Sequence, residues 1–273
     1  MQLEGKVAVI TGGASGIGKG TALAMARLGM DIVIADVNER RLHEARSEIA
    51  ALGGRVLAIH CDVAKEADIQ RLAQVALLEM GPVDILMNNA GVVLRGSLEQ
   101  ISMPDWEWSF SINVLGVVHG IRAFLPQMIA RRSGYIINTA SLAGLVALTG
   151  EGAPYIASKF AVVGLSEALA LYARPKGIGV SVLCPGSVDT HLDETERVIG
   201  MTPQMAQAEA ESQSGFHSVV MTPDEIGAIV VDAVRQNRFF ILPDCPQQAV
   251  ILKRAQDMNA FLEARLAAPR LPG

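Results

Sequence analysis

Short apolar runs recur along the chain, and longer segments with helical spacing of apolar residues separate them. Runs of this length, rich in Val and Ile and bounded by Gly, Asp, Asn or Ser, are typical of buried β-strands. Seven segments fit this description and predict strands: Val7–Thr11, Asp31–Ala35, Arg55–His60, Ile85–Asn88, Gly134–Thr139, Gly179–Cys184 and Phe239–Leu242.

The segments between these runs predict amphipathic helices, because their apolar residues recur every three or four positions. They are Ile17–Leu28, Glu39–Leu52, Lys65–Met80, Pro104–Arg131, Pro154–Ala173 and Pro223–Gln236. The last of them has a strong start signal, since Thr222 precedes it and Glu225 follows three residues later, as in a capping box. This alternation predicts an α/β fold: a doubly wound, Rossmann-like parallel sheet of about seven strands with helices on both faces.

We find no linker, internal repeat or low-complexity segment, so we expect residues 1–273 to form a single domain. The stretch 191–221 interrupts the alternation and is rich in Glu, Gln and Met. Because it follows the C-terminal end of a predicted strand, where α/β sheets bind ligands, it is a candidate substrate lid. A surface insertion without a catalytic role is the alternative. A last helical pattern covers residues 246–268.

Composition agrees with this fold class and narrows the range of partners. Half of the residues are apolar, only 4% are aromatic and 19% are charged. This mixture favours helices packed on a buried parallel sheet over a β-sandwich. The formal charge of −5 is mild and no basic cluster is present, which argues against nucleic acid as a partner.

Three further features bear on where the protein acts. Cys61, Cys184 and Cys245 are widely separated and lie in apolar surroundings, a pattern of reduced thiols in a cytosolic protein. No basic segment with a long apolar stretch precedes the first predicted strand, so we expect no secretory signal. The most apolar stretch, residues 136–148, is interrupted by polar side chains and is unsuited to cross a bilayer. We therefore expect a soluble cytoplasmic protein that binds no membrane.

A glycine-rich turn, Thr11-Gly12-Gly13-Ala14-Ser15-Gly16-Ile17-Gly18, follows the first predicted strand and opens the first predicted helix. Glycine lets the backbone turn tightly and approach a pyrophosphate, whose charge the helix N-terminus attracts. A P-loop is the nearest alternative, since Gly13 to Lys19 has the spacing Gly-x-x-x-x-Gly-Lys. The next residue is Gly20, where a magnesium-binding P-loop needs Ser or Thr. The turn therefore predicts a dinucleotide site.

Asp36 ends the second predicted strand, 18 residues after Gly18. A carboxylate at this place accepts hydrogen bonds from the ribose hydroxyls of NAD and repels the 2′-phosphate of NADP. No basic residue adjoins it, and we expect Arg40 and Arg41, a helical turn further on, to be solvated. NAD is therefore the predicted cofactor.

Tyr155 and Lys159 are four residues apart in a predicted helix, which places the phenol and the ammonium on one face. A free phenol has a pKa near 10, too high for ready proton exchange at neutral pH. A cation held close favours the phenolate, so we expect Lys159 to lower the pKa of Tyr155 and make it a usable acid/base.

With these motifs in order, the chain resembles the compact single-domain branch of the short-chain dehydrogenase/reductase family over nearly its whole length. The matching segments are Thr11–Gly18, Asp62-Val63, Asn88-Asn89-Ala90-Gly91, the set Asn113, Ser141, Tyr155 and Lys159, and Pro185-Gly186 with Val188 and Thr190. One departure is that Ser141 and Tyr155 are 14 residues apart, slightly more than the family pattern leads us to expect. A turn near Thr149–Ala153 would absorb the difference.

The resemblance implies a role for each matching residue. Expected cofactor contacts are Gly12, Ser15, Gly16, Ile17, Gly18, Asp36, Asp62, Val63, Asn89, Ala90, Gly91, Tyr155, Lys159, Pro185, Gly186, Val188 and Thr190. The implied catalytic set is Asn113, Ser141, Tyr155 and Lys159. In that set Tyr155 exchanges a proton with the substrate, Ser141 stabilises the substrate oxygen, and Lys159 reaches the nicotinamide ribose. The backbone of Asn113 would hold a water molecule that links Lys159 to solvent; from the residues alone, a plain buried Asn is equally compatible.

These observations predict an NAD-dependent oxidoreductase that interconverts a secondary alcohol and its ketone. No Arg or Lys is placed to grip a carboxylate or phosphate, which favours a small, uncharged, moderately hydrophobic substrate. The histidines and cysteines have no metal-ligand spacing, so we expect no metal. The resemblance also implies a homo-oligomer, a tetramer or a dimer. Two alternatives remain: an NADPH-dependent 3-oxoacyl reductase, against which Asp36 argues, and a catalytically silent nucleotide-binding scaffold protein.

Overall fold

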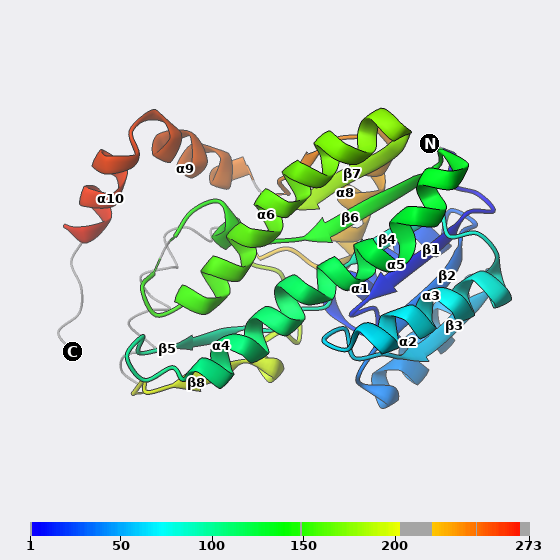
Figure 1. The fold of residues 1–273 in the computed structure, drawn as a ribbon, viewed down its shortest axis with the longest axis horizontal. Coiled ribbons are helices and arrows are strands. Elements are labelled where there is room, and N and C mark those ends of the chain that lie inside the picture. The colour runs from blue at the N-terminus through cyan, green and yellow to red at the C-terminus, as the bar shows by residue number, and fades with distance from the viewer. Residues whose placement is uncertain (1, 148, 203–219, 244, 268–273) are drawn as a thin grey trace.

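The computed structural model of the protein describes residues 2–147, 149–202, 220–243 and 245–267. Seven parallel strands form the main sheet in the order β3-β2-β1-β4-β6-β7-β9 (Figure 1). Their bounds are β1 Val7–Thr11, β2 Asp31–Asp36, β3 Val56–His60, β4 Ile85–Asn88, β6 Gly134–Thr139, β7 Ile178–Leu183 and β9 Phe240–Ile241. The predicted doubly wound sheet is confirmed, and the strand order reverses between β1 and β4.

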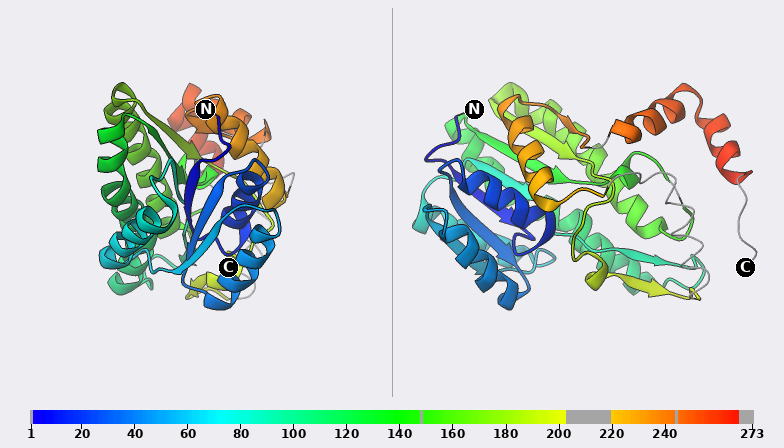
Figure 2. Two further views of the ribbon diagram at one scale, coloured as in Figure 1. Left: turned by 90° about the vertical axis from the view of Figure 1, so that its right-hand side faces the viewer. Right: turned by 180° about the vertical axis from the view of Figure 1, so that it is seen from behind.

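Helices cover both faces of this sheet (Figure 2). They are α1 Gly16–Ala26, α2 Glu39–Ala50, α3 Glu66–Met80, α5 Gly116–Arg131, α6 Ala153–Ala173 and α8 Pro223–Arg235. The helices α1, α2 and α8 pack on one face in a core that includes Met25 and Ile34, and α3, α5 and α6 pack on the other around Phe124 and Leu86. Strands covered on both faces need apolar side chains on both, which explains the nearly continuous apolar runs.

Two helical stretches, Met103–Arg131 and Ala153–Lys176, are long and apolar enough to cross a membrane by length and composition. Both contribute to the core, because Phe124 and Met128 of α5 and Leu169 of α6 are buried against the sheet. The core helix of a soluble protein passes the same test of length and composition. The packing of these two helices on the sheet is that of core helices.

The longest predicted helix is divided in the structure. Residues 104–131 form α4 (Met103–Phe110), a π-helical segment (Ser111–Leu115) and α5. A π-helical turn adds one residue to the helical repeat and is frequent at functional sites. The predicted C-terminal helix is also divided, into α9 (Cys245–Gln256) and α10 (Met258–Leu266), because extended Asp257 accepts a hydrogen bond from the backbone of Ala260 at 2.9 Å.

A second, two-stranded parallel sheet lies beside the main one and was not expected from the sequence. Its strands are β5 (Leu94–Gly96) and β8 (Arg197–Ile199), and a 3-10 turn (Asp193–Thr195) precedes β8. Strands of this length are too short to show an alternating pattern. The 3-10 turn and β8 occupy the first part of the expected lid, while residues 203–219 of that segment lie outside the described residues.

The helices α1 and α8 approach each other through glycine. An added Cβ atom on Gly20 would lie 2.2 Å from the carbonyl oxygen of Pro223, and one on Gly227 would lie 2.4 Å from that of Gly20. A Cβ atom at either position would clash with a backbone carbonyl oxygen of the other helix, and the two packed helices would have to move apart. This contact fixes α1, and with it the turn at its N-terminus.

We therefore expect Gly20→Ala to lower the free energy of unfolding by about 1–3 kcal/mol, the usual cost of overpacking. Gly164→Ala on α6 is the matched control, since an added Cβ there meets nothing within 4 Å. The control should be neutral or stabilising by up to about 1 kcal/mol through helix propensity. Urea unfolding measures both; equal effects of the two substitutions would contradict the close packing.

Candidate active site

A cleft of about 320 Å³ opens at the carboxyl ends of the strands, where the strand order reverses. The predicted site residues that line it are Gly12, Ser15, Gly16, Ile17, Asp36, Asp62, Val63, Asn89, Ala90, Gly91, Ser141, Tyr155, Lys159, Pro185, Gly186, Val188 and Thr190. Segments far apart in the sequence thus share one cavity. Two predicted residues, Gly18 and Asn113, are not among its lining residues.

The glycine turn forms one end of the cleft. Gly12 and Gly16 have φ angles of 62° and 49°, in the left-handed region that favours glycine. The helix α1 begins at Gly16, its N-cap Ser15 makes no side-chain capping hydrogen bond, and its first turn has no acidic residue. The first N–H groups of α1 therefore remain available to an anion, and the turn fits a pyrophosphate.

Asn89, at the end of β4, holds this turn in place. Its Nδ2 donates to the carbonyl oxygens of Thr11 at 3.1 Å and Gly12 at 3.2 Å, and its Oδ1 accepts from the hydroxyl of Thr139. Gly18 packs against the same turn from inside α1, since an added Cβ would lie 2.2 Å from the carbonyl oxygen of Gly12. Gly18 thus shapes the turn without lining the cleft.

Asp36 lies at the C-terminal end of β2 and has a fixed carboxylate. One oxygen accepts from the backbone N–H of Ala14 at 3.2 Å, and the other from that of Asn38 at 3.0 Å. Each carboxylate oxygen can accept a second hydrogen bond. The group therefore fits a pair of ribose hydroxyls.

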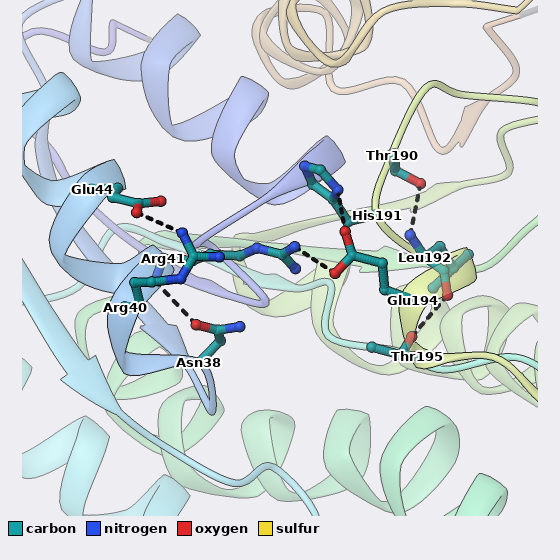
Figure 3. A network of polar contacts seen from close by, with 9 residues as sticks. All are labelled: Asn38, Arg40, Arg41, Glu44, Thr190, His191, Leu192, Glu194 and Thr195. Atoms are coloured by element: carbon teal, nitrogen blue, oxygen red, sulfur yellow. Dashed lines mark hydrogen bonds and ion pairs between the residues drawn. The ribbon is translucent and has the colours of Figure 1, made fainter.

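Arg41 is not solvated as we expected. Its side chain is 16% exposed, lines the cleft and pairs with Glu194 at 2.5 Å (Figure 3). Only Arg40 meets the expectation, with a side chain 70% exposed and paired with Glu44. Sequence analysis could not find the pair of Arg41, because its partner is 153 residues away along the chain.

Ser141 and Tyr155 meet at the other end of the cleft. Ser141 caps a 3-10 turn (Leu142–Gly144), where its Oγ accepts from the N–H of Ala143 at 3.1 Å. Its hydroxyl interacts with the phenol of Tyr155, in the first turn of α6, and lowers the pKa of that phenol. A turn immediately before α6 absorbs the longer spacing between the two residues, as expected.

Lys159 lies one helical turn after Tyr155 on α6, and its side chain is buried, with 4% exposed. Its Nζ donates to the carbonyl oxygen of Thr139 at 3.1 Å and lies 5.6 Å from the centre of the Tyr155 ring. Burial lowers the pKa of Lys159 from 10.5 to about 8, because a buried ammonium loses its hydration.

The pKa of Tyr155 moves in the direction opposite to our expectation. Burial raises it, although the side chain faces the cleft, and the hydrogen bond from Ser141 offsets part of that rise. Desolvation disfavours the phenolate more strongly than the neighbouring groups stabilise it. In the protein alone, Tyr155 is therefore a protonated acid at neutral pH.

Asn113 lies in the π-helical segment, buried behind the cleft. Its Oδ1 accepts from the N–H of Val92 at 2.9 Å, and its Nδ2 donates to the carbonyl oxygen of Val92 and to the hydroxyl of Ser158, both at 3.0 Å. The side chain thus joins the loop after β4 to α6, one residue before Lys159. A well-satisfied buried side chain is compatible with both of our interpretations, because the implied water would be held by the backbone of Asn113.

His191, Leu192 and Thr195, from the stretch expected to form a lid, also line the cleft. Other lining residues were not predicted as part of the site: Val37, Asn38, Arg41, Cys61, Val92, Ile112, Thr139 and Ala140. Most of these adjoin a predicted residue in the sequence, which is the signal that could have found them. Burial raises the pKa of the Cys61 thiol to about 12, so it remains protonated. Within the described ranges, no three His, Cys, Asp or Glu side chains are grouped to hold a metal ion.

Comparison with known proteins agrees with this geometry. A family model described as short chain dehydrogenase matches residues 6–198. The 3beta-hydroxysteroid dehydrogenase 2 of Eggerthella lenta is 36% identical over 231 residues, covering 83% of this chain and 86% of the relative. Cyclohexanol dehydrogenase of an Acinetobacter strain is 30% identical over 88% of this chain and 92% of its own. A short-chain dehydrogenase/reductase from Burkholderia phymatum, solved in complex with NAD, superposes with a TM-score of 0.87 at 36% identity, covering 95% of this chain and 96% of its own.

The fold and the cleft define a Rossmann-like dinucleotide-binding protein. The chain belongs to the short-chain dehydrogenase/reductase family, and the resemblance drawn from its motifs is confirmed. The relatives support an oxidoreductase that uses a nicotinamide nucleotide.

The low pKa of buried Lys159 gives a test of its burial. Between pH 8 and 10.5 the unfolded chain binds a proton at this lysine that the folded chain has lost, so its contribution to stability rises with pH. The free energy of unfolding of the native protein, relative to Lys159→Met, should rise across this window by up to roughly 3 kcal/mol. Urea unfolding at several pH values measures it. Lys253→Met, at an exposed lysine, should show no such rise, and a flat difference for Lys159→Met would contradict the burial.

Proposed function

We propose that the protein is an NAD-dependent oxidoreductase that interconverts a secondary alcohol and its ketone by hydride transfer. One observation carries this proposal: Ser141, Tyr155 and Lys159 line the same cleft as the glycine turn, with Lys159 Nζ 5.6 Å from the centre of the Tyr155 ring. An acid/base, a hydrogen-bond donor and a cation are the groups that carbonyl–carbinol chemistry needs at the substrate oxygen.

The residues divide the work as follows. When bound, the nicotinamide supplies or accepts the hydride. In ketone reduction Tyr155 donates its phenolic proton to the substrate oxygen, and in alcohol oxidation the phenolate takes the hydroxyl proton. Ser141 donates a hydrogen bond to the same oxygen and stabilises its developing charge. Lys159 would hold the nicotinamide ribose and stabilise the phenolate. Asn113 positions the helix that carries Lys159, and its backbone would hold a water molecule that links Lys159 to solvent.

Cofactor contacts follow the shape of the cleft. The turn from Gly12 to Gly18 would hold the pyrophosphate, and Asp36 the adenosine ribose. Asp62 and Val63 would border the adenine, and Asn89, Ala90 and Gly91 would border the nicotinamide ribose. Pro185, Gly186, Val188 and Thr190 would hold the carboxamide. The fixed Asp36 carboxylate supports NAD over NADP, because it accepts from ribose hydroxyls and repels a 2′-phosphate.

The substrate we propose is a small, uncharged and moderately hydrophobic alcohol or ketone. Val92, Ile112 and Leu192 are apolar residues in the lining of the cleft. The names of two relatives denote dehydrogenases of a cyclohexanol and a 3β-hydroxysteroid, both uncharged secondary alcohols.

We also infer a homo-oligomer, a tetramer or a dimer, acting in the cytoplasm. The outward side of α6 exposes Leu171 (82%) and Tyr172 (56%), large side chains that a second copy could cover. Sedimentation velocity tests the oligomer, and a monomer at micromolar concentration would refute it.

Activity is tested first with a panel of secondary alcohols with NAD and of ketones with NADH, following absorbance at 340 nm. Turnover of at least one member is expected. No turnover on a broad panel, by protein that binds NADH, would refute the alcohol–ketone assignment.

Tyr155→Phe should lower kcat by about a hundredfold or more, the usual share of general acid–base catalysis, while NADH still binds. Tyr172→Phe is the matched control, because it makes the same change on α6 at an exposed position away from the cleft. Initial rates and NADH fluorescence titration give the two readouts. Unchanged kcat in Tyr155→Phe would remove Tyr155 from its acid/base role.

The two directions should respond oppositely to pH. Since burial raises the pKa of Tyr155, the phenol predominates at neutral pH, and alcohol oxidation should accelerate as pH rises from 7 to 10. Ketone reduction should slow over the same range, because it consumes the protonated form. Initial rates in both directions with one alcohol–ketone pair check this, and parallel profiles would count against Tyr155 as the titrating group.

A further inference from the structure

A polar network spans the adenosine end of the cleft (Figure 3). Arg41 reaches from the first turn of α2 to Glu194, in the 3-10 turn before β8. Both oxygens of the Glu194 carboxylate are engaged: one with the Arg41 guanidinium at 2.5 Å, the other with Nδ1 of His191 at 2.7 Å. Arg41 and His191 line the same cleft as Asp36.

Without Glu194, Arg41 would present an unpaired cation to this end of the cleft. The helix α2 begins at Glu39, and Arg41 lies in its first turn. The N-terminus of α2 is capped by Asn38, which accepts from the backbone N–H of Arg41 at 3.1 Å, so the group left for a phosphate is the Arg41 guanidinium. The Glu194 carboxylate neutralises the Arg41 guanidinium. Glu194 remains ionised, because the hydrogen bond from Arg41 lowers the pKa of its carboxyl group.

The segment that carries Glu194 is anchored by other contacts. Glu196 forms an ion pair with Arg95, and β8 pairs in register with β5. The guanidinium of Arg197 lies 3.6 Å from the centre of the Trp108 ring. Glu194 is thus presented to Arg41 from a fixed backbone, unlike a side chain on a free loop.

We propose that Glu194 is a second determinant of cofactor choice: it holds Arg41 in an ion pair and so withholds the guanidinium from the 2′-phosphate of NADP. This rests on the proposed dinucleotide-dependent function and extends it. Asp36 repels the phosphate directly, and Glu194 removes the cation that would otherwise offset that repulsion. Arg41 could bind a phosphate, but only when its ion pair with Glu194 is broken.

The neighbouring pair of Arg40 and Glu44 supplies a matched control. It lies on the same helix at 2.7 Å, with side chains 70% and 53% exposed, and neither residue lines the cleft. Glu44→Gln therefore changes the net charge of the protein as Glu194→Gln does, without releasing a cation into the cleft.

The experiment compares the dissociation constants of NADH and NADPH by fluorescence titration at one low ionic strength. Glu194→Gln should tighten NADPH binding about tenfold and change NADH binding by less than about threefold, since a single ionic contact with a phosphate contributes about 1.4 kcal/mol or more. Glu194→Ala should give the same gain, which makes the test independent of one substitution. Glu44→Gln should change neither constant, and Glu194→Gln with Arg41→Ala should lose the gain.

Four results would overturn the inference. They are no gain for NADPH in either Glu194 variant, equal weakening of both cofactors, a gain of the same size in Glu44→Gln, and a gain that survives Arg41→Ala. Equal weakening of both cofactors would mean that the ion pair of Glu194 stabilises the cleft in general and does not distinguish NADPH from NADH. Failure of the native protein to bind either cofactor would instead remove the proposed function itself, which keeps the two failures distinct.

Discussion

The burial of a parallel sheet on both faces is the constraint from which the rest of the structure follows. Parallel neighbours need crossover connections, and helices on both faces supply them. All strand-to-helix turns then lie at one edge of the sheet. The strand order reverses between β1 and β4, so the connections after these two strands run to opposite faces of the sheet and leave a cleft between them. The glycine turn, Asp36, Asn89 and Ser141 meet there because each follows a strand of the same sheet.

Burial also sets the electrostatic character of the cleft. It lowers the pKa of Lys159 to about 8 and raises that of Tyr155. At neutral pH the lysine is still mostly an ammonium, whereas the phenol is neutral. Both groups are sensitive to any charge that a ligand brings, because buried surroundings screen charges poorly. Catalytic groups with shifted pKa values are common for this reason.

The segment from Val188 to Ile199 connects the two ends of the cleft. Its first residues border the candidate nicotinamide region, Glu194 pairs with α2 at the adenosine end, and β8 joins β5 beside α4. One short stretch therefore touches the proposed sites of cofactor selection and of substrate binding. Its position depends on ion pairs and on a small sheet, and much less on core packing.

The sequence by itself determined the sheet, its helices and most of the candidate site, because the information is local. Apolar runs mark buried strands, and the turns that follow them carry Gly12, Asp36, Asn89 and Ser141. Tertiary structure decided what depends on distant partners: the pairing of Arg41 with Glu194, and the short β5–β8 sheet. It also decided the pKa of Tyr155, which rises because burial outweighs the opposing effect of Ser141. The pattern of residue types along the chain does not report how deeply one side chain is buried.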